Sequence, residues 1–462
     1  MSRLNKKSWI GLVIILISLV ISGCGTSLEE QASTAAATSK PTIAPTSTTI
    51  QTSTPMPTST PTPIPTETPT VTPTFSPETL NLPAGAPLNI GYLLWETNMI
   101  GIDSKRGIEI AVSDFGGEIS GHPIELIGAN SECNAFAAQQ GSRILMQDET
   151  IIGVIGTTCS LGGLEAAPIV SDNNRVIISP SNSNPELTAP ETHSAGYFRT
   201  GPNDLFQLKA LAHYAFDDLG ARHLAVVRGA TDPFQRLYSI TLCEFFTSLG
   251  GECVLDKAKD SGSTYVTPII NSVVAADPDV IYFMGWDYKE GAAFLSEAKN
   301  SPDLEDTPIF LWGESYNNSG FLQEAGEDAI GVYITATSYE IDRETDFYQT
   351  FLSTHRNEYG EEPVNIYHPY AYDAATLLLK AITQVAVPGD DGSLMVDPLA
   401  VRDAMYNQVE FQGLGGFVSC SQFGDCLTTA NGKVYQFTGG DPSTFNPGPA
   451  DLLSSNPAQV WP

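Results

Sequence analysis

Two short segments rich in serine, threonine and glycine carry the residues best suited to hold a small anion. The first runs from Gly156 to Gly163 and includes Ser160, and the second, Ser179 to Ser183, includes Ser181. Hydroxyl groups donate hydrogen bonds, and free backbone N–H groups near a helix start favour negative charge. Each segment follows an apolar run, so we expect both at the carboxyl ends of strands, where a carboxylate would fit.

Two further side chains add an aromatic wall and a negative charge. Trp286 comes shortly after one apolar run, and Glu314 comes shortly after another. A carboxylate at a strand end can pair with a cation, whereas an indole offers flat apolar surface. Purely structural roles are the alternative: a solvated loop carboxylate for Glu314 and core packing for Trp286. Ser160 and Ser183 would then only satisfy backbone groups of their own turns.

The cysteines indicate an oxidising compartment. The chain has seven, and apart from Cys24 the remaining six predict three disulfides, although many pairings are possible. We favour the short pairs Cys133 with Cys159, Cys243 with Cys253, and Cys420 with Cys426. A metal site is the alternative, but no Cys-x-x-Cys occurs and the six histidines are scattered, so we expect no metal.

Short apolar runs alternate with amphipathic segments beyond Leu80, which predicts an α/β fold with mainly parallel sheets and helices on both faces. The expected strands are Asn89 to Leu94, Ile124 to Gly128, Ile151 to Ile155, Val176 to Ser179, His223 to Val227, Val280 to Met284 and Ile309 to Trp312. The expected helices are Ser104 to Phe115, Ala135 to Met146, Phe206 to Leu219, Tyr265 to Ala276 and Tyr370 to Val385. Continuous apolar strands are typical of parallel sheets that are buried on both faces.

The amino-terminal residues have the layout of a secretory signal. Basic residues up to Lys7 precede an apolar run from Trp9 to Ile21, and small residues then lead to Cys24. The run is shorter than the roughly 20 apolar residues that span a bilayer, so we prefer a cleaved signal to a membrane helix. The stretch ISGC resembles a bacterial lipobox, which implies cleavage before Cys24 and lipid attachment to its thiol. Durable anchoring would need more than one acyl chain.

Composition separates a stalk from a globular part. From about Thr34 to Pro77 the chain is almost entirely Thr, Pro, Ser and Ala, which predicts an extended, unfolded segment. The remainder is too long for one ordinary core, so we expect two lobes. A formal charge of -31 argues against nucleic acid or anionic lipid headgroups as partners.

The run VIGTTCSLGGLEAAPIVSDNNRVIISPSNSNPELT closely resembles the leucine, isoleucine and valine binding proteins of bacterial ABC importers. The resemblance covers roughly Leu88 to Phe437 and includes SECNAF, DVIYFMGW, IFLWGESYNN and YAYDAATLLLKAI. It implies a two-lobed type I periplasmic binding fold with three hinge crossovers, near Arg199, Ala336 and Gln412. The expected parts are a signal peptide at 1–23, an anchored stalk at 24–80, lobe 1 at 81–200 and 337–411, and lobe 2 at 201–336 and 412–462.

The resemblance also implies roles in the first lobe. The family's disulfide matches Cys133 with Cys159, and its carboxylate-binding serine falls on Ser160. The residue whose carbonyl meets the ligand's ammonium falls on Ser181. A hydroxyl that touches both ends of the amino acid falls on Ser183.

In the second lobe the family's cleft aromatic falls on Trp286, its ammonium-binding glutamate on Glu314, and a further aromatic near Phe234. The position of the aromatic over the ligand's side chain corresponds to Ile100, and Trp95, earlier in the same loop, is the aromatic that we expect to contact the ligand there. The frame that holds an amino acid is therefore recognisable, whereas the side-chain pocket differs. Short amides, urea and carboxylates stay open as ligands.

The implied function is capture of an amino acid or similar polar solute outside the cell membrane, without a cofactor. The expected partners are the ligand, ABC permease subunits, and the membrane through the lipid on Cys24. A ligand-sensing receptor module without transport is the alternative. An enzyme is disfavoured because no Gly-x-Ser-x-Gly, His-Glu-x-x-His or Walker motif occurs. Cys159 would also lose its thiolate in a disulfide.

Overall fold

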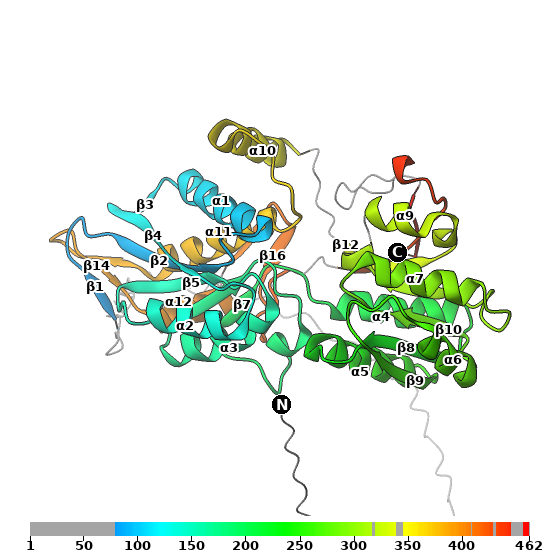
Figure 1. Ribbon diagram of the computed structural model, residues 1–462. Helices are drawn as coiled ribbons and strands as arrows, with labels where there is room; N and C mark the ends of the chain where they lie inside the picture. Colours follow the sequence, from blue (N-terminus) through cyan, green and yellow to red (C-terminus); the bar gives the residue numbers. More distant parts are fainter. Residues whose placement is uncertain are drawn as a thin grey trace, which may run out of the picture. The chain divides into compact units, whose positions relative to one another are not determined.

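The computed structural model describes residues 79–316, 319–338, 345–407, 409–427, 431–444 and 456–461. The expected signal peptide, Cys24 and the stalk up to residue 78 therefore lie outside the described residues. Leu80, the expected last residue of the stalk, already belongs to strand β1 (Leu80–Leu82), which pairs with β14 (Leu394–Val396). The described residues form two large sheets with helices packed against them (Figure 1). In the part described, no helix is both long and apolar enough to cross a membrane.

The first sheet has the strand order β3-β4-β2-β5-β6-β7. Its strands are β2 (Leu88–Leu94), β3 (Glu118–Ile119), β4 (His122–Asn130), β5 (Ile151–Gly156), β6 (Val176–Ser179) and β7 (Tyr197–Arg199). Strands β4, β2, β5, β6 and β7 run parallel, and β3 joins β4 as an antiparallel edge. This arrangement confirms the expected parallel α/β character.

The second sheet has the order β18-β17-β12-β11-β10-β8-β9. Its strands are β8 (His223–Gly229), β9 (Glu252–Lys259), β10 (Val280–Phe283), β11 (Ile309–Trp312), β12 (Tyr333–Ser338), β17 (Asn431–Gln436) and β18 (Ala458–Trp461). The five neighbouring strands β9, β8, β10, β11 and β12 run parallel, whereas β17 and β18 add antiparallel strands at one edge.

Both sheets are wound in the same sense. In each, the second parallel strand lies beside the first, and the next three continue on the other side: β4-β2-β5-β6-β7 and β9-β8-β10-β11-β12. The winding direction therefore reverses between β2 and β5 and again between β8 and β10. Such a switch point leaves a crevice at the carboxyl ends of the strands, which is where doubly wound sheets bind ligands.

Helices cover these sheets. Those packed with the first are α1 (Met99–Asp114), α2 (Ala135–Leu145), α3 (Ser160–Asp172), α11 (His368–Val385) and α12 (Pro398–Asn407); those packed with the second are α4 (Leu205–His213), α5 (Pro233–Ser248), α6 (Thr267–Ala276), α7 (Tyr288–Lys299) and α9 (Ser319–Ala325). The chain also forms α8 (Gly313–Tyr316) and α10 (Asp346–Tyr359). The expected helix from Phe206 to Leu219 ends earlier, because a π-helical turn, Tyr214–Asp218, follows α4.

The apolar runs are continuous because the first sheet is buried on both faces. Along β5, Ile152 and Ile155 pack in the core shared with α1 and α11, whereas Ile151 and Val154 pack in the core shared with α2 and α3. Both faces of the strand are therefore apolar, and the irregular register opposite Asn89 and Ile90 accounts for the three-residue spacing within each set.

The packing bears on the third crossover, which we expected near Gln412. That residue ends β15 (Glu410–Gln412), which pairs with β16 (Phe417–Ser419). Leu414 and Val418 still pack in the core of the first sheet, and the core of the second sheet resumes at Val434. Because those side chains beyond Gln412 bury their apolar surface against the first sheet, we propose that this crossover lies after them. The other lobe boundaries remain as proposed from the sequence.

Three disulfides pair as expected from the short spacings: Cys133 with Cys159, Cys243 with Cys253, and Cys420 with Cys426. The first lies between the loop before α2 and the start of α3. It therefore ties together two loops at the carboxyl edge of the first sheet. Cys159, bonded in this way, has no thiolate to act as a nucleophile.

Candidate functional site

Three loops of the first sheet meet at its switch point. They follow β2, β5 and β6 and contain Trp95, Thr158 and Ser181 respectively. The backbone N–H of Trp95 donates to the Thr158 hydroxyl at 2.8 Å. This bond crosses the switch point, because β2 and β5 are the strands between which the winding reverses. The structure thus brings these three loops together at the carboxyl end of the first sheet.

Ser160 begins α3 and links two of these loops. Its Oγ accepts the backbone N–H groups of Ser183 at 3.1 Å and Asn184 at 3.2 Å. A hydroxyl has two acceptor lone pairs and one donor, so these bonds leave the O–H to donate. The first N–H groups of a helix also lack partners within the helix. The start of α3 is therefore suited to an acceptor such as a carboxylate.

The side chain of Ser181 is buried and engaged within the protein. Its hydroxyl donates to the carbonyl of Thr158 at 2.7 Å, and its N–H donates to Ser179 Oγ at 3.2 Å. The hydroxyl therefore holds the turn in shape. The role that the family resemblance implies for Ser181 involves its carbonyl oxygen, and that role stays a prediction.

Ser183 contacts Asp204, a residue that the sequence motifs did not single out. Its hydroxyl interacts with the carboxylate of Asp204, and its carbonyl accepts the N–H of the same residue at 2.9 Å. Asp204 is fully buried, and burial raises its pKa to about 6 against the opposing hydrogen bonds from Ser183 and Gln207. Its position just before α4, in the crossover from the first sheet to the second, was the available signal.

Aromatic side chains gather at the carboxyl edge of the second sheet. Trp286 follows β10 and is 56% exposed, whereas Trp312, the last residue of β11, is buried. Their rings meet edge to face with centroids 4.6 Å apart. Phe234, in the first turn of α5, lies 6.0 Å from Trp286 and 5.5 Å from Trp312. The structure thus joins Phe234 and Trp286 in one aromatic wall at the second switch point.

Asp232 was also missed by sequence reasoning. It precedes α5, and one carboxylate oxygen accepts the N–H groups of Phe234 and Gln235. The other oxygen accepts the indole N–H of Trp286. The dipeptide Asp232-Pro233 is a recognisable helix start. Its capping role was therefore readable from the sequence, but its contact with Trp286 was not.

Glu314 lies in α8, immediately after the strand that ends at Trp312. Its side chain falls outside the described residues, so its pairing with an ammonium group stays a prediction.

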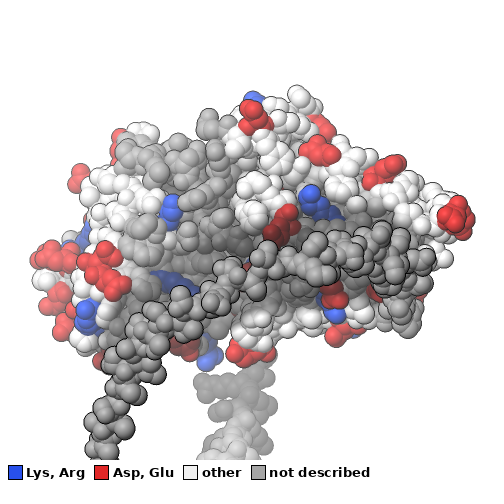
Figure 2. Space-filling model, turned by 180° about the vertical axis from the view of Figure 1, so that it is seen from behind, with Lys and Arg blue, Asp and Glu red and all other residues white. Residues whose placement is uncertain are grey.

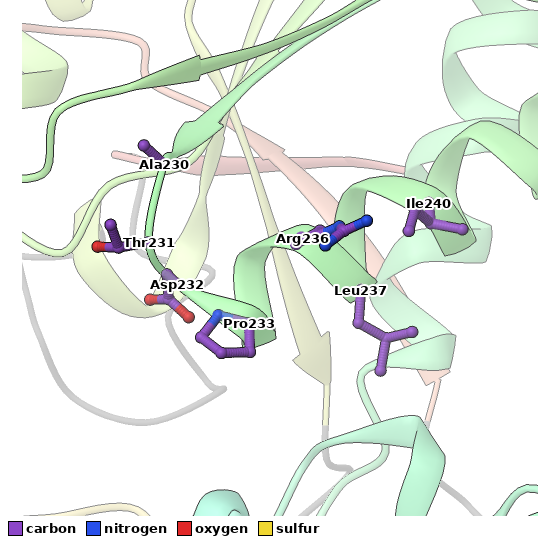
Figure 3. Close-up of a pocket in the computed structure, with 7 residues that line it drawn as sticks. All are labelled: Ala230, Thr231, Asp232, Pro233, Arg236, Leu237 and Ile240. Carbon is purple, nitrogen blue, oxygen red and sulfur yellow. The ribbon is translucent and has the colours of Figure 1, made fainter. Parts of the chain in front are cut away.

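A surface hollow of about 330 Å³ lies beside the second switch point (Figure 3). The loop after β8 and the first turns of α5 supply its lining: Ala230, Thr231, Asp232, Pro233, Arg236, Leu237 and Ile240. The serine turns do not contribute to it, so this hollow is separate from the expected carboxylate site.

Two doubly wound sheets joined in one chain, with polar and aromatic loops at their switch points, define the type I periplasmic binding fold. Solved structures share it. The leucine-binding protein LivK of Thermotoga maritima matches with a TM-score of 0.60 at 22% identity, covering 76% of this chain and 96% of that one. LivJ of Streptococcus pneumoniae, solved with isoleucine, has a TM-score of 0.58 at 20% identity, and the match covers 81% of this chain and 100% of that one. A solute-binding protein from R. palustris, solved with benzoate, has a TM-score of 0.58 at 20% identity, and the match covers 77% of this chain and 94% of that one.

Sequence comparison gives the family. The model of periplasmic binding proteins matches residues 96–438, and the chain belongs to this family. An amino acid binding protein of Pseudomonas aeruginosa is 26% identical over 39% of this chain and 48% of its own length, so the match spans about half of that relative. The Leu/Ile/Val-binding protein homolog 3 of Brucella melitensis is 24% identical over 54% of this chain and 68% of its own length. These findings confirm the family predicted from the sequence motifs.

Proposed function

We propose that this chain is the extracytoplasmic solute-binding protein of an ABC importer and captures an amino acid. The observation that carries the proposal is the start of α3. There the Ser160 hydroxyl accepts two backbone N–H groups and so keeps its own proton for a ligand oxygen. The solute's carboxylate would bind at this point.

The other end of the ligand would bind the second lobe. Trp286 and Phe234 would contact its apolar part, and Glu314 would receive its ammonium, which the Ser181 carbonyl of the first lobe would also meet. A ligand held by both lobes favours the closed form, because it makes its full set of contacts only there. The proposed role is binding without catalysis.

The named relatives support this ligand class, since two of them are an amino acid binding protein and a Leu/Ile/Val-binding protein homolog. An aromatic carboxylate such as benzoate is the second candidate. The wall formed by Phe234, Trp286 and Trp312 favours it, because the exposed indole of Trp286 offers a flat apolar face on which an aromatic ligand can stack.

Isothermal calorimetry with L-leucine, L-isoleucine, L-valine, L-phenylalanine and benzoate tests the proposal. We expect Kd for the bound ligand to rise about 10- to 150-fold in Ser160→Ala, since a hydrogen bond to a charged group contributes about 1.5–3 kcal/mol. Glu314→Gln should weaken amino-acid binding by roughly 2–5 kcal/mol. It should leave benzoate binding unchanged, which separates the two ligand classes.

The matched control is Ser171→Ala, near the other end of α3. Ser171 Oγ also accepts a backbone N–H, that of Gly196 at 2.9 Å. A loss of affinity that is equal in both serine variants would mean that Ser160 acts only through the fold. If none of the five compounds binds, the proposed ligand class is refuted.

Export and anchoring complete the proposal. Cleavage before Cys24, lipid on its thiol and the Thr/Pro-rich stalk would hold the binding domain outside the membrane, within reach of permease subunits. Labelling of cells with a radioactive fatty acid tests this, because Cys24→Ser should lose the label. A ligand-sensing role without transport predicts that solute uptake persists when the gene is deleted, whereas the importer role predicts that uptake is lost.

A further inference from the structure

We propose that Asp232 is a positioning residue that fixes the indole of Trp286 in the orientation in which it meets the ligand. This inference rests on the proposed function for the ligand and adds a residue that touches no ligand itself. It acts through Trp286.

The geometry gives Asp232 two separate tasks. Its Oδ1 caps α5 by accepting the N–H groups of Phe234 at 2.9 Å and Gln235 at 3.3 Å. Its Oδ2 accepts the indole N–H of Trp286. One carboxylate therefore ties the loop after β8 to the loop after β10. These are the strands between which the second sheet reverses its winding.

Trp286 needs such a restraint because it is 56% exposed. An exposed indole can adopt several rotamers, and choosing one on binding costs conformational entropy. Here the edge-to-face contact with Trp312 holds one side of the ring and Asp232 holds its N–H. Together they leave one orientation for the exposed face, so the entropy is lost during folding and not during binding.

Three N–H groups already donate to the two oxygens of Asp232, so the carboxylate is committed mainly to contacts within the protein. Replacement of the carboxylate can also separate its two tasks. Asparagine is as good a helix cap as aspartate, and its carbonyl oxygen can accept the N–H groups of Phe234 and Gln235. Its amide group is a donor and cannot accept the indole N–H. Asp232→Asn should therefore keep α5 and release Trp286.

The first test uses the ¹⁵N-labelled full chain without ligand. The chain has five tryptophans, so the indole N–H signals are few, and Trp286→Phe identifies the one from Trp286. We expect this signal to exchange slowly with water in the wild type. In Asp232→Asn it should move upfield and exchange several-fold faster. An unmoved signal with unchanged exchange would overturn the positioning role.

The matched control is Asp287→Asn. Asp287 caps α7 through the N–H of Lys289 at 2.9 Å, and it is the residue next to Trp286. The same substitution there removes a nearby charge and keeps a cap, but it leaves the Asp232 contact intact. The Trp286 exchange rate should stay at the wild-type value, and faster exchange in this variant would show that lost charge alone explains the effect.

The second test is calorimetry with L-isoleucine and benzoate in a double-mutant cycle. Asp232→Asn should raise Kd about three- to tenfold, the range expected when a side chain must be ordered on binding. The same change in a Trp286→Phe background should have no further effect. If Asp232→Asn still lowers the affinity in the Trp286→Phe background, the inference is overturned. If the wild type binds neither these two probes nor the other three amino acids named above, the proposed ligand class fails together with the ligand-facing half of the inference. The exchange measurement still decides whether Asp232 orients the indole.

Discussion

Replacing Lys259 by methionine should destabilise the folded chain by about 3–5 kcal/mol. Lys259 Nζ lies 2.7 Å from Glu290 Oε2, and both side chains are only 3% exposed. Methionine retains much of the apolar stem but leaves the Glu290 carboxylate without its counterion. The N–H of Gly262, which also donates to Glu290, cannot neutralise that charge.

The magnitude follows from distance and burial. Opposite charges 2.7 Å apart attract by on the order of 6 kcal/mol at an effective dielectric constant of about 20. The exposed pair of Arg356 and Glu362, with side chains 50% and 53% exposed, is the matched control. Water screens that pair, so Arg356→Met should cost at most about 1 kcal/mol.

Urea unfolding followed by tryptophan fluorescence, together with scanning calorimetry, measures both variants. Each kcal/mol lowers Tm by about 2–4 °C in a domain of this size, so Lys259→Met should lose roughly 6–20 °C. The double variant Lys259→Met, Glu290→Leu should recover part of the loss, since an apolar pair needs no counterion. Equal stability of Lys259→Met and Arg356→Met would refute this reasoning, as would a double variant no better than Lys259→Met.

Two further predictions concern buried polar groups. Burial raises the pKa of Asp373 from 3.8 to about 7 although Leu414 and Gly415 donate N–H groups to it. The folded state therefore holds the proton of the Asp373 carboxyl more tightly than the unfolded state does. The free energy of unfolding has the full contribution of this group below about pH 4 and loses about 4 kcal/mol as pH rises through about 7. Asp373→Asn should flatten that part of the profile in urea unfolding at several pH values, and an unchanged slope would contradict it. Arg199→Met should lower the free energy of unfolding, measured by calorimetry, by more than about 3 kcal/mol, because the buried guanidinium pairs with Asp425 at 2.5 Å. A decrease below about 1 kcal/mol would contradict this prediction.

Local patterns predicted most of the fold. The segments Val176 to Ser179 and Ile309 to Trp312 are strands with the expected bounds, because parallel strands buried on both faces must be apolar throughout. The position of Ser160, at a helix start after such a strand, was predicted from the same pattern, whereas its contact with a ligand stays a prediction. The short cysteine pairs were found because neighbours in sequence on adjacent elements are close in space.

Long-range partners could not be predicted in this way. Arg199 and Asp425 are 226 residues apart, and Trp286 and Asp232 are 54 apart. Nothing in the local pattern of either chain segment selects the other, since many carboxylates are available in so acidic a chain. On the described part of the surface in Figure 2 acidic side chains are indeed scattered widely. Only the topology of the second sheet, which places β8 beside β10, brings Asp232 to Trp286.

The two switch points solve the same physical problem with different groups. A crevice opens where the winding reverses, and its two sides belong to strands that are separate in sequence. In the first sheet the Thr158 hydroxyl spans this crevice by accepting the N–H of Trp95, and in the second sheet Asp232 spans it by accepting the indole N–H of Trp286. Each bond fixes a loop that we propose to contact the solute, so less conformational freedom remains to be lost on binding. If this preorganisation matters, weakening either bond should reduce affinity while the sheets keep their stability, because none of the four bonded residues, Trp95, Thr158, Asp232 and Trp286, belongs to a hydrophobic core of the sheets.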